Sequence, residues 1–263
     1  MHFPHFFFFL LPVLLTLPLP AASGLIPPHL LTSRGIPFDS SITAIPPLSE
    51  AALVKAYPST KTCTNPPFPQ AECDTAATAA PNIELAYTSY SLTTLGQKAA
   101  VLATLAAESA NFKANINHSN NRPGQGTKAM LLFPNVLAFA SSIDALKDRV
   151  RQLMGGVVAV SFADVDKISA DVQMSVRALV LPASTTYAAA AWYLTAGPAC
   201  PKDTVGRLST DGWAGFVYYV TKCLQAGSGV DAERKGKWCS AVAALAPAGM
   251  DMPVECNGVA LGK

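Results

Sequence analysis

The chain has 263 residues, of which 50% are hydrophobic and 14% are charged, with a formal net charge of +2. Such a balance provides neither a basic stripe for nucleic acid nor an acidic tail. The apolar, alanine-rich composition is instead typical of one sizeable helical domain with a packed core.

The first residues, MHFPHFFFFLLPVLLTLPLPAASG, form a phenylalanine- and leucine-rich block without a charged side chain, followed by small residues. This pattern is typical of a secretory signal peptide, which we expect to be cleaved after Ser23. The block is short for a membrane anchor and three prolines interrupt it, and no later segment is apolar enough to span a bilayer. The sequence therefore predicts a secreted protein whose residues 1–23 are removed and whose mature chain does not enter a membrane.

Six cysteines lie beyond the signal, and an even number in an oxidising compartment favours disulfides. We expect each bond to close a local loop, as Cys63–Cys73, Cys200–Cys223 and Cys239–Cys256. A zinc site is the alternative, but no CxxC pair occurs and the mature chain keeps only His29 and His118. No dinucleotide-binding or phosphate-binding loop motif is present. We expect neither a metal nor a cofactor.

The stretch over residues 24–81 is rich in proline, which discourages helices and central strands. We expect an extended N-terminal arm here, with the small Cys63–Cys73 loop and one short helix over 49–56 capped by Ser49. The arm is not strongly hydrophilic, so part of it should pack on the domain.

From residue 82 to the C-terminus the periodicity of apolar residues becomes helical. The polar, glycine-containing residues 111–130 interrupt it and predict a loop or short hairpin. The fold class predicted is all-α, with one irregular polar insert or short β-hairpin in a helical domain over 82–263. The expected helices lie at 82–92, 94–107, 133–154, 161–181, 184–196, 209–225 and 231–245. Trp192, Trp213 and Trp238 occur at helical spacing among apolar residues, so we assign them to the core rather than to sugar stacking.

Glu108 is the acid whose surroundings favour catalysis, because it falls in the last turn of its predicted helix. The unsatisfied carbonyls there, and the apolar neighbours Ala106, Ala107 and Phe112, disfavour a charged carboxylate. A glutamic acid that keeps its proton can act as a general acid toward a leaving-group oxygen. The alternative is a surface glutamate at a frayed helix end.

The polar segment that follows contains compact amide side chains suited to sugar hydroxyls and N-acetyl groups, including Asn120 and Asn121. Its glycines let the backbone approach a ligand closely. The candidate substrate-binding residues are Asn115, Asn117, Gln125, Thr127, Gly124 and Gly126. The alternative is an ordinary asparagine-rich turn.

Asn117-His118-Ser119 is also an N-glycosylation sequon, and a glycan on Asn117 would argue against an open cleft. His118 has two interpretations, a proton shuttle or a simply exposed histidine.

This combination resembles the lysozyme-like superfamily, especially lytic transglycosylases and goose-type lysozymes. In those proteins a helix ends in a catalytic Glu-Ser, followed by a phenylalanine and a glycine-containing hairpin. The matching positions are Glu108, Ser109, Phe112, Asn115, Gly124, Gly126 and Met130. The resemblance covers about residues 94–140. It implies a lysozyme-like multi-helix domain that cleaves an N-acetylated polysaccharide, chitin or peptidoglycan, with Glu108 as general acid.

The chain is also similar to a group of uncharacterised secreted fungal proteins that share the pattern E-S-x-x-F…N-x-N…G-Q-G-T…M. That second resemblance covers most of the mature chain and implies no activity.

Glu108 has no acidic neighbour in the sequence before Asp144, so the insert cannot supply the second carboxylate of a two-acid glycosidase. Asp144, Asp164 or Asp166 would have to fold into the cleft, although each is better explained as a solvated helix residue. Otherwise the acetamido group of the substrate could assist, as the resemblance to lytic transglycosylases implies. We favour this single-acid chemistry. The competing interpretation is a non-catalytic binding or effector protein on the same scaffold.

Overall fold

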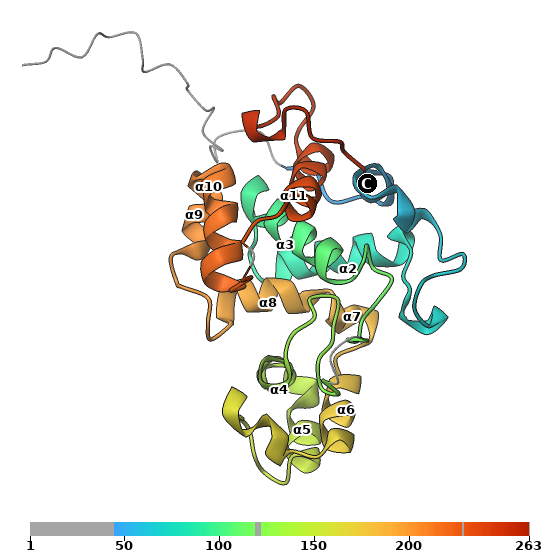
Figure 1. Ribbon diagram of the computed structural model, residues 1–263, viewed down its shortest axis with the longest axis vertical. Coiled ribbons are helices and arrows are strands. Elements are labelled where there is room, and N and C mark those ends of the chain that lie inside the picture. The colour runs from blue at the N-terminus through green and yellow to red at the C-terminus, as the bar shows by residue number, and fades with distance from the viewer. Residues whose placement is uncertain (1–44, 119–121, 228, 263) are drawn as a thin grey trace, which may run out of the picture. The chain divides into compact units, whose positions relative to one another are not determined.

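The structure is a computed structural model that describes residues 45–118, 122–227 and 229–262. The predicted signal peptide and the start of the proline-rich arm, with His29, lie outside these residues. The described part is mainly helical, and none of its residues forms a named strand (Figure 1). The prediction of an all-α fold is confirmed.

The helices follow one another along the chain with short connections. They are α1 (Glu50–Ala56), α2 (Ala76–Ser89), α3 (Leu95–Glu108), α4 (Phe133–Ser142), α5 (Lys147–Leu153), α6 (Ala170–Ala178), α7 (Ala183–Thr186), α8 (Ala188–Ala196), α9 (Thr204–Thr210), α10 (Gly212–Tyr218) and α11 (Ala232–Leu245). Short 3₁₀ turns lie at Pro58–Lys61, Gln70–Glu72, Asp144–Leu146, Phe162–Lys167 and Val254–Cys256, and a π turn at Tyr219–Cys223.

Helix α3 is the central element, because every residue from Leu95 to Ala106 is buried. It begins with a capping box, in which two residues cap each other. The Thr94 side chain accepts a hydrogen bond from the backbone N–H of Gln97, and the Gln97 side chain accepts one from the backbone N–H of Thr94. It packs against α11, α9 and α8. A helix covered on so many sides has little freedom to move. The residue at its C-terminal end is therefore held where the helix leaves the core.

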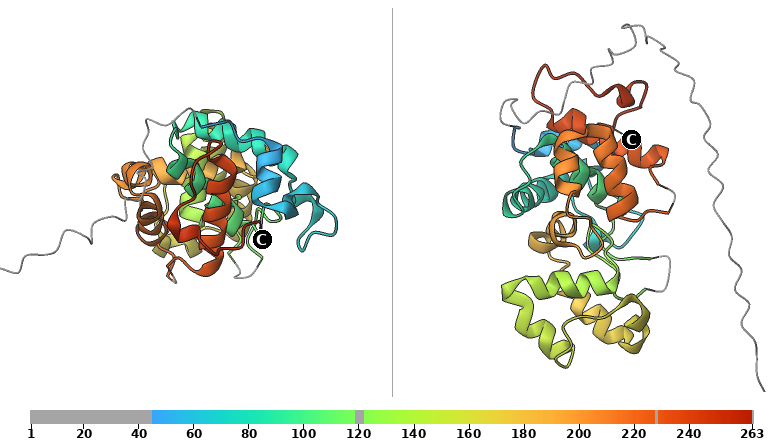
Figure 2. Two further views of the ribbon diagram at one scale, coloured as in Figure 1. Left: turned by 90° about the horizontal axis from the view of Figure 1, so that it is seen from above. Right: turned by 90° about the vertical axis from the view of Figure 1, so that its left-hand side faces the viewer.

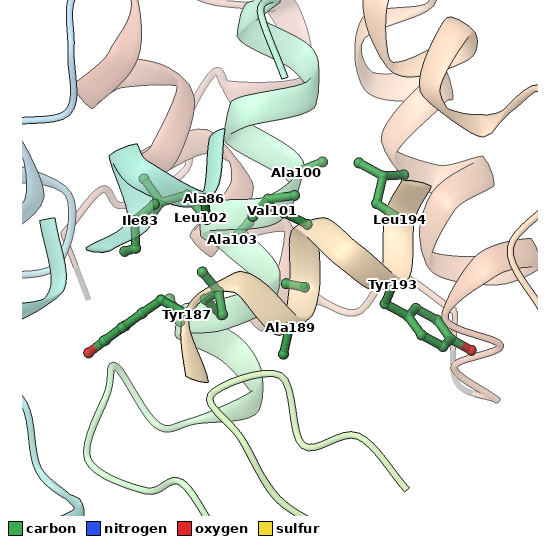
Figure 3. Close-up of a cluster of buried hydrophobic side chains, with 14 of the residues drawn as sticks. Ile83, Ala86, Ala100, Val101, Leu102, Ala103, Tyr187, Ala189, Tyr193 and Leu194 are labelled. Carbon is green, nitrogen blue, oxygen red and sulfur yellow. The ribbon is translucent and has the colours of Figure 1, made fainter. Parts of the chain in front are cut away.

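Small side chains bring the central helices close together. Ala86 of α2, Ala100 and Ala103 of α3 and Ala189 of α8 meet in one buried cluster (Figure 3). Helix axes approach more closely where the side chains between them are small. The high alanine content of the sequence therefore serves tight packing around α3.

Helices α4, α5 and α6 pack on one another, and α4 contacts α8 (Figures 1 and 2). The polar insert joins α3 to this group. It contains isolated bridges from Gly126 to Ile116 and to Leu131 instead of a regular hairpin. The prediction of an irregular polar insert is confirmed.

The expected domain boundary at Pro81 differs from the structure. Helix α2 begins at Ala76 and includes Pro81, while the short helix with Ser49 as its cap is present as predicted and packs on α2 and α11. A proline inside a helix leaves a carbonyl one turn earlier without its donor. Ala77 and Pro81 are both exposed, so water can hydrogen-bond to that carbonyl. The arm from residue 45 onward belongs to one compact unit with the C-terminal helices.

Several of the longer predicted helices are divided in the structure. The stretch 133–154 breaks after Ser142, where a 3₁₀ turn separates α4 from α5. The stretch 209–225 breaks at Gly212, whose φ of 54° is left-handed. Apolar periodicity continues across such breaks, so it does not reveal them.

All six cysteines form disulfides with the predicted pairing, Cys63–Cys73, Cys200–Cys223 and Cys239–Cys256. Closed loops of this kind restrict the unfolded chain, and they fit an oxidising compartment.

Among the described helices, none has the length and apolar character needed to cross a bilayer. The assignment of the tryptophans to the core is confirmed for Trp192 and Trp238, and Trp213 packs against Trp238 at 5.1 Å between ring centroids.

Four buried tyrosines predict a steep loss of stability in alkali. Burial raises the pKa of Tyr57, Tyr87, Tyr187 and Tyr219. The unfolded state then loses these protons first, above its pKa of about 10, so folding stability is complete below that pH and falls as the pH rises. The four phenols together contribute at most about 5 kcal/mol per pH unit.

Absorbance of tyrosinate and far-ultraviolet circular dichroism should therefore change together above pH ~10. Tyr57→Phe should make the decline shallower by about a quarter, one phenol in four. Ionisation of all four rings with the helices intact would contradict the prediction.

Candidate functional site

The chain leaves α3 through a left-handed turn. Ala110, Asn111 and Phe112 have φ values of 52°, 55° and 67°, and each such residue costs about 1–3 kcal/mol. The Ser109 hydroxyl donates to the carbonyl of Leu105 at 2.6 Å and accepts from the Phe112 N–H at 2.9 Å. Ser109 thus holds the turn that directly follows the last helical residue.

Phe112 fixes the same turn from the core side. Its ring is fully buried and lies edge-on to Tyr57 and Tyr187, with centroids 6.3 and 5.6 Å away. Edge-to-face pairs of this kind add to the stabilisation from burial. Phe112 therefore has a packing role in the turn.

Glu108 is partly exposed and forms an ion pair with Arg234 of α11. Its side chain is 29% exposed, and Oε1 lies 3.1 Å from Nη2 of Arg234. This position beside a guanidinium differs from the apolar environment that the helix end and the neighbouring side chains predict. Arg234 also pairs with Asp231 at 3.2 Å. Sequence reasoning missed Arg234 because it is 126 residues from Glu108.

Two pockets meet at Glu108, and both are also lined by Met130. The inner pocket has a volume of about 130 Å³, and its polar lining includes Thr104, Asn135 and Tyr219. The outer pocket has a volume of about 520 Å³. Its other lining residues include Phe68, Asn117, His118 and Gln125. The structure thus brings Glu108 together with two of the predicted amide residues.

Those two amides bind each other as well as the insert backbone. Asn117 Nδ2 donates to Gln125 Oε1, and Gln125 Nε2 donates to the carbonyl of Met130 at 2.9 Å. A glycan on Asn117 would replace one of the two hydrogens on the Nδ2 atom that makes the first of these bonds. Residues 119–121, which include the sequon serine, Asn120 and Asn121, lie outside the described part of the chain.

The other predicted substrate-binding residues are buried within the insert. Thr127 is fully buried and Asn115 is 8% exposed. A Cβ at Gly126 would lie 2.8 Å from the Asn115 carbonyl oxygen, and one at Gly124 would lie 2.5 Å from the Phe133 ring. These glycines allow close packing inside the protein rather than approach to a ligand. The four residues support the pocket wall.

The ammonium of Lys128 is fully buried and anchors the insert. Nζ donates to the carbonyls of Glu72 and Phe112, at 2.5 and 3.0 Å, and lies 3.1 Å from Asp74 Oδ2. Burial lowers the pKa of Lys128, and the nearby Asp74 carboxylate opposes that shift. The hydroxyl of Tyr187 donates to the same Asp74 oxygen at 3.0 Å.

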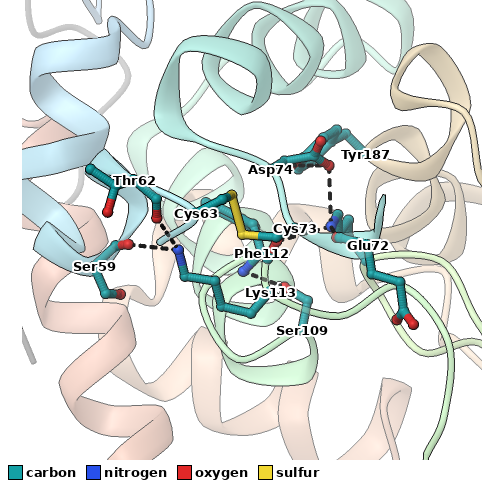
Figure 4. The surroundings of a disulfide bond; sticks show 11 residues. Ser59, Thr62, Cys63, Glu72, Cys73, Asp74, Ser109, Phe112, Lys113 and Tyr187 are labelled. Carbon is teal, nitrogen blue, oxygen red and sulfur yellow. Dashed lines mark hydrogen bonds and ion pairs between the residues drawn. A yellow bond between two sulfur atoms is a disulfide. The ribbon is translucent and has the colours of Figure 1, made fainter. Parts of the chain in front are cut away.

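The Cys63–Cys73 disulfide lies beside this cluster (Figure 4). Lys113 reaches the same region and donates to the carbonyls of Ser59 and Thr62, at 2.7 and 2.5 Å. Two lysines thus satisfy the backbone carbonyls that directly precede the two cysteines, those of Thr62 and Glu72.

A buried carboxylate, Glu72, supports His118 in the outer pocket. Its Oε2 accepts from the backbone N–H groups of Asn115 and Ile116, at 3.1 and 3.4 Å. His118 Nε2 lies 2.9 Å from Oε1, and its ring stacks on Phe68 with centroids 4.6 Å apart. Sequence reasoning missed Glu72, which it placed in the arm. The sequence contains one indication that Glu72 is held in place, because the next residue, Cys73, is expected to form a disulfide.

The three aspartates considered as second acids do not line either pocket at Glu108. Lys147 and Lys167 hold the pKa of Asp144 and of Asp164 below the ordinary value, and both carboxylates are at the surface. Asp166 is exposed and lines a separate pocket. Among the described residues, no group of three or more His, Cys, Asp or Glu side chains could hold a metal ion.

Comparisons with known proteins show a similarity over part of the chain. No protein-family model matches the chain, and no solved structure matches it. The chain is 30% identical, over 146 residues, to a bifunctional dioxygenase–epoxy alcohol synthase of Fusarium oxysporum strain Fo5176. The match covers 56% of this chain and 10% of that protein. The chain thus spans about a tenth of the relative's length, and the match shows no shared family.

Lys128→Met should destabilise the protein by about 3 kcal/mol, because it removes the buried ammonium that the carbonyls of Glu72 and Phe112 and the carboxylate of Asp74 share. Lys147→Met is the control, since Lys147 pairs with Asp144 at the surface, and it should change stability by less than about 1 kcal/mol. Denaturant unfolding of both variants provides the measurement. Equal midpoints for the two variants would disprove the anchoring role.

Proposed function

We propose that this protein is secreted and cleaves an N-acetylated polysaccharide, chitin or peptidoglycan, with Glu108 as general acid. The observation that carries the proposal is that Glu108 lines two pockets, the larger of which is also lined by Asn117 and Gln125 of the insert. The resemblance of the segment around Glu108 to lysozyme-like proteins supports the same chemistry.

The outer pocket has the composition expected for a sugar. Asn117 and Gln125 provide amide donors and acceptors, and the half-buried ring of Phe68 provides an apolar surface. Its volume of about 520 Å³ falls within the usual range of small-molecule pockets, roughly 300–1,000 Å³. A few well-placed polar groups on an apolar wall are typical of such sites.

The ion pair with Arg234 sets a condition on this chemistry. Glu108 can donate a proton to the glycosidic oxygen only after the carboxyl has been released from Arg234 and protonated. Asp231 offers Arg234 a second partner at 3.2 Å. We propose that bound substrate separates Glu108 from Arg234, which then remains paired with Asp231.

The same ion pair favours a second candidate, a non-catalytic secreted protein that binds a glycan or acts as an effector. A carboxylate held by a guanidinium can accept hydrogen bonds from sugar hydroxyls without donating a proton. In that case Glu108 contributes to binding alone.

Glu108→Gln separates the two candidates. If Glu108 is the general acid, the variant should stay folded and lose about 100- to 10,000-fold in turnover of chitin oligomers or peptidoglycan. Mass analysis of the products provides the measurement. Glu50→Gln, at an exposed position on α1, is the matched control. Equal activity of the two variants would rule out the catalytic role.

Arg234→Gln tests the condition on proton donation. Removing the guanidinium abolishes the ion pair, so turnover at neutral pH should rise several-fold if release of Glu108 from Arg234 limits the reaction. Arg149→Gln, at an exposed position on α5, should leave the rate unchanged. A large fall in turnover for Arg234→Gln would be inconsistent with Glu108 as the acid.

A further inference from the structure

We infer that His118, oriented by Glu72, is the general base that activates a water in the outer pocket. The inference rests on the proposed function and supplies the second proton-transfer group that no acid near Glu108 in the sequence provides. His118 would be the catalytic residue, and Glu72 a positioning residue that acts through it.

The tautomer of His118 follows from its partner. Glu72 is buried, and His118 Nε2 lies 2.9 and 3.0 Å from its two carboxylate oxygens. An ionised carboxylate only accepts hydrogen bonds, so the Nε2 atom carries the hydrogen. In the neutral imidazole the basic lone pair is then on Nδ1. A carboxylate behind a histidine in this way also stabilises the imidazolium that forms when the ring takes a proton.

Glu72 also makes contacts with the insert that do not involve the imidazole. The carboxylate already accepts two backbone N–H groups, from Asn115 and Ile116, and the Glu72 carbonyl accepts from Lys128. His118 adds a side chain that is 31% exposed on the pocket side of this cluster.

His118 and Glu108 line the same pocket, one from the insert and the other from the end of α3. Stacking on Phe68, with the ring planes 10° apart, limits rotation of the imidazole. A base and an acid that line one space are an arrangement suited to the hydrolysis of a glycosidic bond.

The reaction balances without any further reactant. A water oxygen bonds to the anomeric carbon as its proton passes to His118 Nδ1, while the bond to the leaving oxygen breaks and that oxygen takes the proton of Glu108. His118 then returns its proton to solvent, and Glu108 takes one back. The product has a free reducing end rather than an anhydro end.

Chemical rescue of His118→Ala tests this role. With chitin oligomers and peptidoglycan as substrates, the variant should lose about 100-fold or more in turnover. It should bind the same oligomers within about twofold of the unmodified protein, by calorimetry with Glu108→Gln in the background. Added imidazole should restore at least a tenth of the lost rate in His118→Ala. It should restore none in Glu108→Gln with His118 intact.

Glu72→Gln tests the positioning role through the tautomer of the His118 ring, which a purely structural role of Glu72 would leave unchanged. The amide oxygen can still accept from the backbone, but the amide nitrogen would turn the imidazole to the other tautomer. Nitrogen-15 spectra of the His118 ring should show the hydrogen on Nε2 in the unmodified protein and on Nδ1 in the variant.

The outcomes separate the two claims. Three results would overturn the role of His118 alone. They are turnover that depends on Glu108 but not on His118, products with an anhydro end, and a ring hydrogen on Nδ1 in the unmodified protein. No turnover of either substrate by the unmodified protein would overturn both claims.

Discussion

The site depends on the buried ammonium of Lys128. Its hydrogens bind two segments that are distant in sequence: the first provides the carbonyl of Glu72 and the carboxylate of Asp74, and the second provides the carbonyl of Phe112. Glu72 supports His118, and Phe112 belongs to the turn that directly follows Glu108. A buried charge is tolerated only with such complete pairing. One cation therefore ties the residue behind His118 to the turn that follows Glu108.

Rigidity at the other side of the pocket comes from α3. The helix is buried along nearly its whole length, so its last residue can reach solvent only where the chain turns away. That turn is left-handed, and Thr127 and Met130 of the insert also have positive φ, 70° and 47°. Non-glycine residues adopt this conformation at a cost, and they are often found at functional sites. Backbone strain thus occurs in the turn after Glu108 and in the insert, which supports a functional site at this position.

Features that depend on neighbours in the sequence could be predicted. Ser49 as a helix cap, α3 with Glu108 at its end, the irregular insert and the three local disulfides all follow from short-range pattern and loop closure. The boundary expected at Pro81 differs from the structure, in which this proline lies inside α2 on an exposed part of the helix.

Features that depend on distant pairs could not be predicted. The partner of Glu108 lies on α11, and the carboxylate behind His118 lies 46 residues earlier, before α2. No periodicity or spacing connects such residues. The burial of Thr127 could not be predicted for the same reason. Its polar neighbours in the sequence predict exposure, and only the folded backbone covers its side chain.

A titration of the nitrogen-15-labelled Glu108→Gln protein with chitin and peptidoglycan oligomers is the most direct test that the outer pocket is a glycan site. The largest chemical-shift changes are expected at Asn117, His118, Gln125 and Met130, which line that pocket with residue 108. Saturable changes confined to these residues and their neighbours would support a sugar bound against the carboxyl. Changes centred elsewhere, or no saturable change with either glycan, would contradict it.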